Sequence, residues 1–224
     1  MTMLSSLDLI RRVPLFSMLN DTQATSVAEA VIKRRFSRGE VIVEQGKKSN
    51  ALFILLSGRA RVVTADARGR EVILATLYPG DHIGEMSLID NEPHSATVRA
   101  EVQTDVLMLG RVEFARCLPE NPSMAYAVMR NLVQRLRNAD RKIESLALLD
   151  VYGRVARALL EFAAEGGADN MLIREKVSRQ DIAKMVGASR EMVSRVMKDL
   201  EERGFIETQE GGHLLIKDRL HTLG

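Results

Sequence analysis

A short segment near the C-terminus carries side chains that can read the edges of DNA bases. Arg190 and Arg195 can each donate to the O6 and N7 acceptors of guanine, and Glu191 can accept from the N4 amino group of cytosine. The polar residues around them suit phosphate contacts or helix capping, and they are Ser178, Arg179, Ser189, Ser194 and Lys198. If residues 189–202 form a helix, its N-terminal positions can place the two arginines and the glutamate in a major groove.

The elements that would position this segment are two helices joined by a short turn. Ser178 with Asp181 three residues later resembles a capping box that opens the first helix, and Gly187 ends that helix. Ser189 can cap the second helix. Apolar residues mark the buried faces of both helices, and they are Ile182, Ala183, Val186, Val193, Val196, Met197 and Leu200. Strands at 205–208 and 213–216, joined through 209–212, follow as a hairpin, so the sequence predicts a winged helix-turn-helix.

The charge of the chain is nearly balanced overall but uneven along its length. The 32 Lys and Arg residues against 30 Asp and Glu residues give a net charge of +2. Within residues 174–198, seven basic residues stand against three acidic ones. The basic residues are Arg174, Lys176, Arg179, Lys184, Arg190, Arg195 and Lys198. Such a stretch can bind a phosphate backbone, although a solvated helix face and a helix-turn-helix that never contacts DNA remain alternatives.

The composition is typical of a globular, cytoplasmic protein. The 224 residues are 46% hydrophobic and 28% charged, and no apolar run approaches the ~18 residues that cross a membrane. No secretory signal opens the chain, so we expect no membrane partner. The single cysteine, Cys117, excludes an internal disulfide and a cysteine-ligated iron–sulfur cluster. We find no nucleophile–base pair, metal-ligand spacing or Walker-type loop, and we expect neither an enzyme nor a metal site.

Residues 1–120 read as an N-terminal domain of short strands. Strands are predicted at 41–43, 52–56, 60–64, 71–77, 96–100 and 105–109, separated by glycine-containing turns. Because no crossover helix fits between them, they favour a β-sandwich or a β-barrel over a parallel sheet. Two helices are predicted before them, at 4–9 and 22–32, the second with Asp21 as its N-cap.

Residues 121–150 differ from this domain and from the winged helix-turn-helix domain at 151–224. After Asn121 and Pro122, apolar or small residues recur in alternating steps of four and three. They are Ala125, Met129, Leu132, Leu136, Ala139, Ile143 and Leu146. This heptad seam predicts a long helix that pairs with a second copy of the chain, and the alternative is an amphipathic helix on its own domain. The predicted fold class is α+β, with a β-barrel domain, a dimerisation helix and a winged helix-turn-helix.

The segment 178–195 resembles the DNA-binding signature of the catabolite activator / fumarate-nitrate regulator (CRP/FNR) family. The resemblance covers nearly the whole chain: 80–88 is similar to the family's phosphate-binding cassette, 121–149 to its dimer helix and 149–156 to its hinge. It implies a jelly-roll-like cyclic-nucleotide-binding barrel and a homodimeric transcription regulator, whether activator or repressor. The implied partners are double-stranded DNA and RNA polymerase. The family's base-reading residues match Arg190, Glu191 and Arg195, which implies a palindrome with TGTGA-like half-sites.

The resemblance also implies an effector site, which this sequence matches only in part. Members that bind cyclic AMP present a Gly, a Glu, an Arg and a Ser, and Gly84, Glu85 and Ser95 match three of them. His94 stands in place of the Arg, which weakens phosphate binding in the usual pose. Ala139-Asp140 replaces the Thr-Ser pair that contacts adenine. The candidate effector-binding residues are Gly84, Glu85, Met86, Ser87, His94, Ser95, Arg135, Arg137, Ala139, Asp140 and Arg141.

The replaced residues favour an effector that contains guanine. Asp140 can accept from the N1–H and the N2 amino group of guanine, while Arg137 or Arg141 can stack on the base or bond to its O6 and N7 edge. We therefore hypothesise cyclic di-GMP, to which some family members respond, with cyclic AMP or cyclic GMP in a modified pose as the alternative. Other readings stay open: action without a ligand, a module that regulates a protein partner, and haem or gas sensing through His82, His94, His213 or His221.

Overall fold

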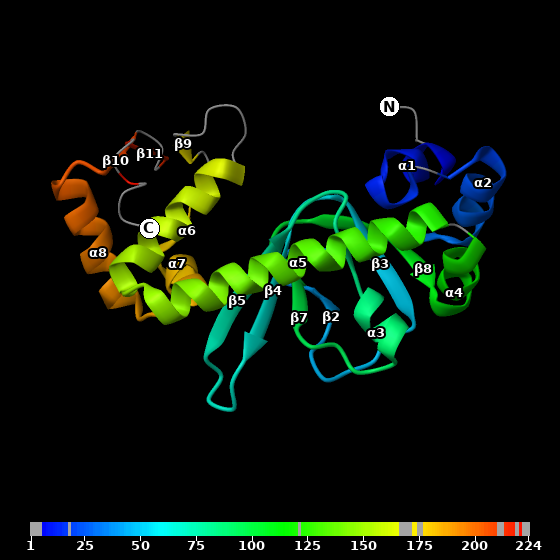
Figure 1. Ribbon diagram of the computed structural model, residues 1–224, viewed down its shortest axis with the longest axis horizontal. Helices are drawn as coiled ribbons and strands as arrows, with labels where there is room; N and C mark the ends of the chain where they lie inside the picture. Colours follow the sequence, from blue (N-terminus) through cyan, green and yellow to red (C-terminus); the bar gives the residue numbers. More distant parts are fainter. Residues whose placement is uncertain are drawn as a thin grey trace. The chain divides into compact units, whose positions relative to one another are not determined.

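The computed structural model describes residues 6–17, 19–120, 122–165, 172–173, 177–209, 213–217 and 220. The chain divides into two compact units within the long helix α5 (Pro122–Leu148), which is drawn in green in Figure 1. We call residues 1–135 the sandwich unit and residues 136–224 the helix-turn-helix unit. In the described part of the chain, no helix is long and apolar enough to span a membrane.

The sandwich unit contains two antiparallel sheets of four strands each, with strand orders β1-β8-β3-β6 and β2-β7-β4-β5. The strands are β1 (Ile32–Phe36), β2 (Val41–Val43), β3 (Ala51–Ser57), β4 (Ala60–Ala65), β5 (Glu71–Leu77), β6 (His82–Ile83), β7 (Thr97–Ala100) and β8 (Thr104–Gly110). Among the described residues no strand of one sheet pairs with a strand of the other. The predicted barrel is therefore a sandwich of two sheets, although the predicted strand-rich α+β fold is confirmed.

Strand β3 lies at the centre of this unit, and its side chains are buried on both faces. Phe53 and Leu55 pack into the core between the two sheets, together with Val98 of β7. Leu52 and Ile54 point to the opposite face, where they pack against helices. A strand covered on both sides reads as a continuous apolar run, which explains why the sequence identifies it clearly.

Helices cover the outer face of the sheet that contains β3. They are α1 (Ser6–Arg12), the 3₁₀ turn η1 (Pro14–Phe16), α2 (Asp21–Ala30), α4 (Arg111–Glu120) and the first part of α5. Ile10, Phe16, Phe114 and Met124 bury their side chains in this layer. Cys117 is a free cysteine buried in the same core, as expected for a small structural residue.

The second predicted helix differs from the structure at both ends. Asn20, rather than Asp21, is the N-cap of α2: its side chain accepts from the Gln23 N–H at 2.9 Å, and the Gln23 side chain accepts from the Asn20 N–H at 3.0 Å. The helix ends at Ala30 because Val31 is extended, and residues 32–36 then form β1. The first predicted helix, at 4–9, corresponds to α1 within the described residues.

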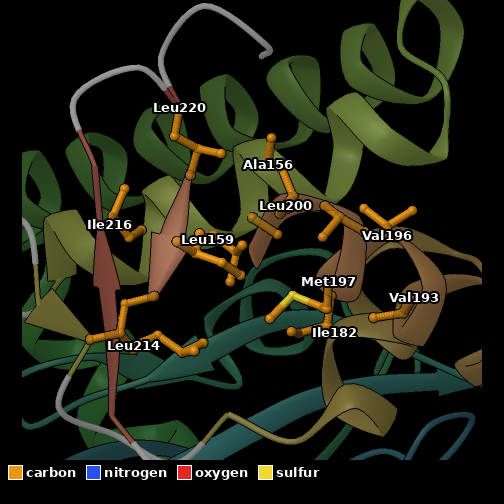
Figure 2. Packing of buried hydrophobic residues seen from close by; sticks show 14 of the residues in the cluster. Ala156, Leu159, Ile182, Val193, Val196, Met197, Leu200, Leu214, Ile216 and Leu220 are labelled. Carbon is orange, nitrogen blue, oxygen red and sulfur yellow. The ribbon is translucent and has the colours of Figure 1, made fainter. Parts of the chain in front are cut away.

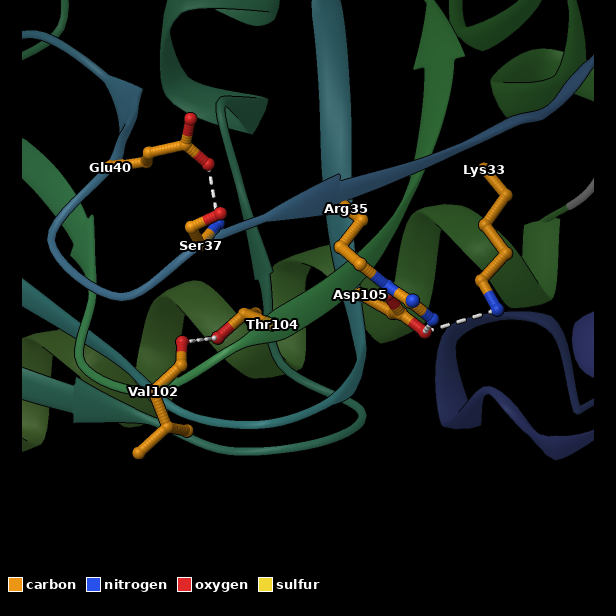
Figure 3. A network of polar contacts seen from close by, with 7 residues as sticks. All are labelled: Lys33, Arg35, Ser37, Glu40, Val102, Thr104 and Asp105. Atoms are coloured by element: carbon orange, nitrogen blue, oxygen red, sulfur yellow. Dashed lines mark hydrogen bonds and ion pairs between the residues drawn. The ribbon is translucent and has the colours of Figure 1, made fainter.

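Strand β1 is held at the sheet edge by ion pairs as well as by backbone hydrogen bonds. Arg35 Nε donates to Asp105 Oδ1 of β8 at 2.7 Å, and Lys33 Nζ lies 3.1 Å from Asp105 Oδ2 (Figure 3). The hydrogen bond from Arg35, followed by that from Lys33, lowers the pKa of the Asp105 carboxyl against the effect of burial. Four of the five β1 residues are exposed, so the sequence pattern lacks the apolar alternation that predicts a strand.

The helix-turn-helix unit confirms the predicted architecture and adds a short strand. Its elements after α5 are α6 (Val151–Glu165), β9 (Leu172–Ile173), α7 (Arg179–Val186), α8 (Arg190–Glu202), β10 (Ile206–Thr208) and β11 (Leu214–Ile216). The strands form one sheet in the order β10-β11-β9. Figure 2 shows Leu159 of α6, Ile182 of α7 and Leu200 of α8 meeting Ile216 of the sheet in one core. Residues 210–212 of the predicted hairpin turn at 209–212 lie outside the described residues, as do Arg174, Lys176 and His221.

The long helix α5 carries an exposed apolar stripe. Met124 and Val128 are buried against the sandwich, whereas the exposed side chains include Tyr126, Met129, Val133, Leu136, Ile143 and Leu146. Four of these exposed residues belong to the predicted heptad seam. Leu132 of the seam instead packs partly against the sandwich core. One side of the first part of α5 thus packs against the sandwich unit, whereas most residues of the predicted seam are exposed.

The difference between a buried leucine in one sheet and an exposed leucine in the other gives a prediction about stability. Replacing the fully buried Leu109 of β8 by alanine leaves a cavity beneath the helices, so we expect the free energy of unfolding to fall by about 2–5 kcal/mol. The matched change at Leu74 of β5, an exposed leucine, should cost about 1 kcal/mol or less. Urea unfolding of both variants measures the difference. Equal losses would contradict the assigned faces of the sheets.

Candidate nucleic-acid interface and effector site

Two serine caps set the geometry of the helix-turn-helix. Ser178 Oγ accepts from the Asp181 N–H at 3.0 Å at the start of α7, and Ser189 Oγ accepts from the Met192 N–H at 3.1 Å at the start of α8. Between the helices Gly187 adopts the left-handed conformation at φ 64°, and its N–H donates to the Ala183 carbonyl. These local bonds are those expected from the sequence, and they leave both serine side chains in structural roles.

Helix α8 presents two distinct faces. Val193, Val196, Met197 and Leu200 point into the core, as Figure 2 shows for this cluster. The candidate DNA-contacting residues lie on the rest of the helix: Arg190, Glu191, Arg195 and Lys198 are exposed and Ser194 is half-buried. Arg179, at the start of α7, is exposed as well. The structure therefore gathers the predicted base-reading residues at the N-terminal part of one exposed helix face.

The charge state of Glu191 suits a hydrogen-bond acceptor. Hydrogen bonds from its own backbone N–H and from the Ser189 side chain lower the pKa of this carboxyl, and Arg190 and Arg195 act in the same direction. The group is exposed and ionised at neutral pH, so both oxygens can accept from a base. Lys198 lies 3.5 Å from Glu202 one turn further on, an exposed pair that holds the lysine only weakly.

The far end of α8 is fastened to the rest of its unit by Arg203. Its guanidinium lies over the rings of Tyr152 at 5.8 Å and Phe205 at 5.0 Å, and Nη1 lies 3.5 Å from Asp199 Oδ2. These contacts join α6, α8 and the start of β10. They fasten the C-terminal end of α8 to neighbouring elements of the same unit.

The junction between α5 and α6 is also capped. The Gly153 N–H donates to Asp150 Oδ1 at 2.8 Å, so Asp150 caps the start of α6 two residues after α5 ends at Leu148. Arg157 of α6 lies 3.8 Å from Glu144 of α5. This junction coincides with the segment 149–156 that the sequence indicates as a hinge.

A second site begins in the sandwich unit at the turn before α3 (Glu85–Asp90). Gly84, the residue before the helix, has φ 95°, and a Cβ atom placed there would lie 2.7 Å from the Ala51 carbonyl oxygen. Both observations require glycine at this position. Glu85 directly follows this tight turn, and its side chain has only 1% exposure.

Arginine 135 of α5 reaches this buried carboxylate. Nη1 donates to Glu85 Oε1 at 2.7 Å, and Nη2 donates to the carbonyl oxygen of His82. Burial raises the pKa of the Glu85 carboxyl, and the positive charge of Arg135 opposes that change. Within the described residues, three buried atoms around this contact have no hydrogen-bond partner: Glu85 Oε2, Ser87 Oγ and His82 Nε2. Buried polar atoms without partners are uncommon in folded proteins, and each of these three can form a hydrogen bond with a polar ligand.

His94 does not provide a cation at this site. Its side chain is only 9% exposed, and Nε2 lies 2.8 Å from Ser49 Oγ. Burial lowers the pKa of the imidazole, which is therefore neutral at pH 7. Of the neighbouring candidate residues, Ser95 and Met86 are exposed and Ser87 is buried. The structure thus brings Glu85, which follows the turn at Gly84, together with Arg135, and it turns His94 toward the loop at Ser49.

The remaining effector candidates lie on the part of α5 that belongs to the other unit. Arg137, Ala139, Asp140 and Arg141 are all exposed, and Arg141 Nη2 donates to Asn138 Oδ1. Their participation in the effector site stays a prediction.

The sequence pattern missed three residues in and around this site. Arg111 of α4 donates from Nη2 to the Ser87 carbonyl at 3.0 Å and from Nη1 to the Leu88 carbonyl at 3.2 Å. His82 is buried at the start of the turn, and Ser49 holds His94. Arg111 binds backbone carbonyls that lie more than 20 residues away in the sequence. No short sequence motif can therefore predict this contact. His82 was considered only as a haem ligand, and the described residues contain no cluster of three or more metal-ligating side chains.

Comparison with known proteins assigns both halves of the chain. A family model described as a cyclic nucleotide-binding domain matches residues 33–121, and one described as a Crp-like helix-turn-helix domain matches residues 153–220. The chain is 36% identical over 185 residues to the cAMP-activated global transcriptional regulator Vfr of Pseudomonas aeruginosa, covering 79% of this chain and 86% of Vfr. It is 28% identical over 216 residues to the CRP-like cAMP-activated regulator of Mycobacterium tuberculosis, covering 94% and 95% of the two chains.

A solved structure with the same architecture belongs to a regulator named for a different cyclic nucleotide. The c-di-GMP responsive global regulator CLP of Xanthomonas campestris superimposes with a TM-score of 0.76 at 26% identity. The alignment covers 88% of this chain and 99% of CLP. The relatives therefore share the two-part architecture, although their descriptions name different cyclic nucleotides.

The burial of His82 makes stability depend on pH. Burial, helped by the charge of Arg135, lowers the pKa of His82 from 6.5 to about 4, so between these values the unfolded chain binds the proton more tightly. Stability is then fully present above pH 6.5 and falls as the pH decreases, by about 2 kcal/mol at pH 5. Urea unfolding at pH 7 and pH 5 should show this loss in the wild type and a smaller one in His82→Gln. The same loss in both proteins would rule out His82 as its source.

Proposed function

Because the chain belongs to the CRP/FNR family of cyclic-nucleotide-responsive, DNA-binding transcription regulators, we propose that it acts as a homodimer on palindromes with TGTGA-like half-sites under the control of cyclic di-GMP. The observation that carries the DNA-reading part is the exposed group Arg190, Glu191 and Arg195 at the start of α8. Its opposite face is locked into the core, so these side chains are held on a rigid support. Arg and Glu together read G·C base pairs in the major groove.

The exposed apolar stripe on α5 supports the proposed dimer. Leu136, Ile143 and Leu146 are exposed at heptad spacing, which is unfavourable for a helix that stays alone in water. Pairing two copies through this seam buries the stripe and supplies two recognition helices. A two-fold symmetric protein then matches a palindrome whose half-sites lie about one helical turn apart. As in the family, we expect RNA polymerase to be the protein partner at such promoters.

The effector part rests on the chemistry of two places. At the cassette, Glu85, Ser87 and His82 leave buried polar atoms for a ligand, while the neutral His94 offers no charge for a phosphate. On α5, Arg137 and Asp140 carry the donor and acceptor groups that read guanine. An effector with two guanines and two phosphates uses these groups better than cyclic AMP does. The likeness to CLP, described as responsive to c-di-GMP, supports this choice.

Substitution of Arg190 tests the reading of sequence. Arg190→Ala removes a bidentate contact to guanine, so we expect specific binding to a TGTGA-type palindrome to weaken by about 1–3 kcal/mol and selectivity at that base pair to relax. Lys198→Ala, which removes a phosphate contact, should weaken binding to all sequences alike and lower the salt dependence. Gel shifts on specific and random duplexes separate the two effects. Equal losses of Arg190→Ala on both duplexes would contradict base reading by Arg190.

Calorimetric titration tests the effector. Purified protein should release or absorb heat with cyclic di-GMP at lower concentrations than with cyclic GMP or cyclic AMP. Asp140→Asn should weaken cyclic di-GMP binding. The amide keeps one acceptor oxygen, but its NH2 group faces the second guanine donor and cannot accept from it. Glu144→Gln, the same change at an exposed carboxylate one turn further along α5, should leave binding intact. Tight binding of cyclic AMP alone would transfer the assignment to that nucleotide, and no response to any of the three would remove cyclic nucleotides as effectors.

A further inference from the structure

One large apolar side chain is conspicuous on the surface of the winged helix-turn-helix. Among the residues described after position 150, Met192 is the large hydrophobic residue exposed to solvent, with 42% of its surface accessible. The other large apolar residues described in this region are buried or half-buried in the core of α6, α7, α8 and the sheet. An apolar group this exposed beside charged neighbours contributes nothing to that core.

The position of Met192 on α8 is defined by local bonds. It is the third residue of the helix, and its N–H is held by Ser189 Oγ at 3.1 Å. It follows Glu191 directly and lies one turn before Arg195, so its side chain flanks the Glu191 and Arg195 pair on the helix surface. Because Val193, the next residue, is fully buried, the backbone at this point cannot rotate to hide the methionine.

Only one feature of the major groove is apolar. Each base pair presents hydrogen-bond donors and acceptors there, and thymine adds a 5-methyl group. Arg190, Glu191 and Arg195 can recognise the polar groups but gain nothing from a methyl. A methionine side chain is long, unbranched and polarisable, so it can follow a methyl group without a fixed geometry.

We infer that Met192 is a specificity residue that contacts the 5-methyl group of a thymine next to the base pairs read by Glu191 and Arg195. This inference rests on the proposed function, because it requires α8 to lie in a major groove. A TGTGA half-site supplies thymines on both strands, opposite its adenine as well as beside its guanines. Burial of the methionine against a methyl group gives the complex an apolar contact that a site without that methyl lacks.

The replacement of thymine by deoxyuridine tests the inference because it removes the methyl group and leaves every hydrogen-bonding group in place. We would select the preferred palindrome from random duplexes, replace one thymine at a time in one half-site, and measure affinity by fluorescence anisotropy. The full-length wild type should bind about fourfold more weakly when one particular thymine is replaced, and equally well when the others are.

Two variants of the same residue make the test specific. Met192→Ser should bind the thymine and deoxyuridine sites equally, whereas Met192→Leu should keep most of the preference because it retains an apolar contact. Circular dichroism melting of both variants verifies that the exposed substitution leaves the fold intact.

The failures of the inference and of the proposed function are distinguishable. Specific binding by the wild type with no effect of any deoxyuridine, or the same effect in Met192→Ser, overturns the role of Met192 alone. So does a selected half-site without a thymine, or a Met192→Ser variant that binds DNA normally and loses only transcription with RNA polymerase, which would assign the side chain to a protein contact. Absence of any sequence preference in the wild type overturns the proposed function together with the inference.

Discussion

A carboxylate without solvent exposure is the constraint on which the sandwich unit depends. Glu85 directly follows the tight turn at Gly84, and within the described residues its counter-charge is Arg135 of α5. A buried charge is tolerated in a protein only when it is paired and hydrogen-bonded. The cassette turn, the position of α3 and the placement of the long helix therefore have to be compatible with a single 2.7 Å contact. Any ligand that binds Glu85 Oε2 does so next to this contact.

The cassette helix is secured at both ends by arginines from other elements. Arg135 binds the start of the turn through His82 and Glu85, while Arg111 of α4 binds carbonyl groups toward the end of α3. A helix of six residues has little stability of its own, so these contacts and its packing on β3 determine where it lies. In the other unit, α8 obtains its rigidity differently, from an apolar face and the stacking of Arg203.

Features with local causes could be predicted from the sequence, and those with distant causes could not. The helices that carry Ser178 and Ser189 were located because cap, buried face and breaker all lie within a few residues. Strand β1 was missed because its exposed residues lack the apolar alternation of a strand, and its ion pairs to Asp105 join residues about seventy positions apart. The choice of Asn20 over Asp21 as a cap depends on which of two adjacent polar residues has extended backbone. For the effector site, the motif indicated Gly84 and Glu85, whereas the turning of His94 toward Ser49 depends on the folded loop.

The continuity of α5 has a consequence for the recombination of such proteins. Residues up to Arg135 belong to the sandwich unit, and residues from Leu136 onward belong to the helix-turn-helix unit. If two regulators exchanged their DNA-binding domains at the helix junction near Asp150, the second half of α5 from one protein would meet α6 from the other. An exchange between residues 135 and 136 keeps each compact unit whole, because the backbone hydrogen bonds of a helix do not depend on which side chains it carries. Joining two regulators within α5, between residues 135 and 136 and with the heptad register preserved, is therefore the less disruptive way to build a chimera.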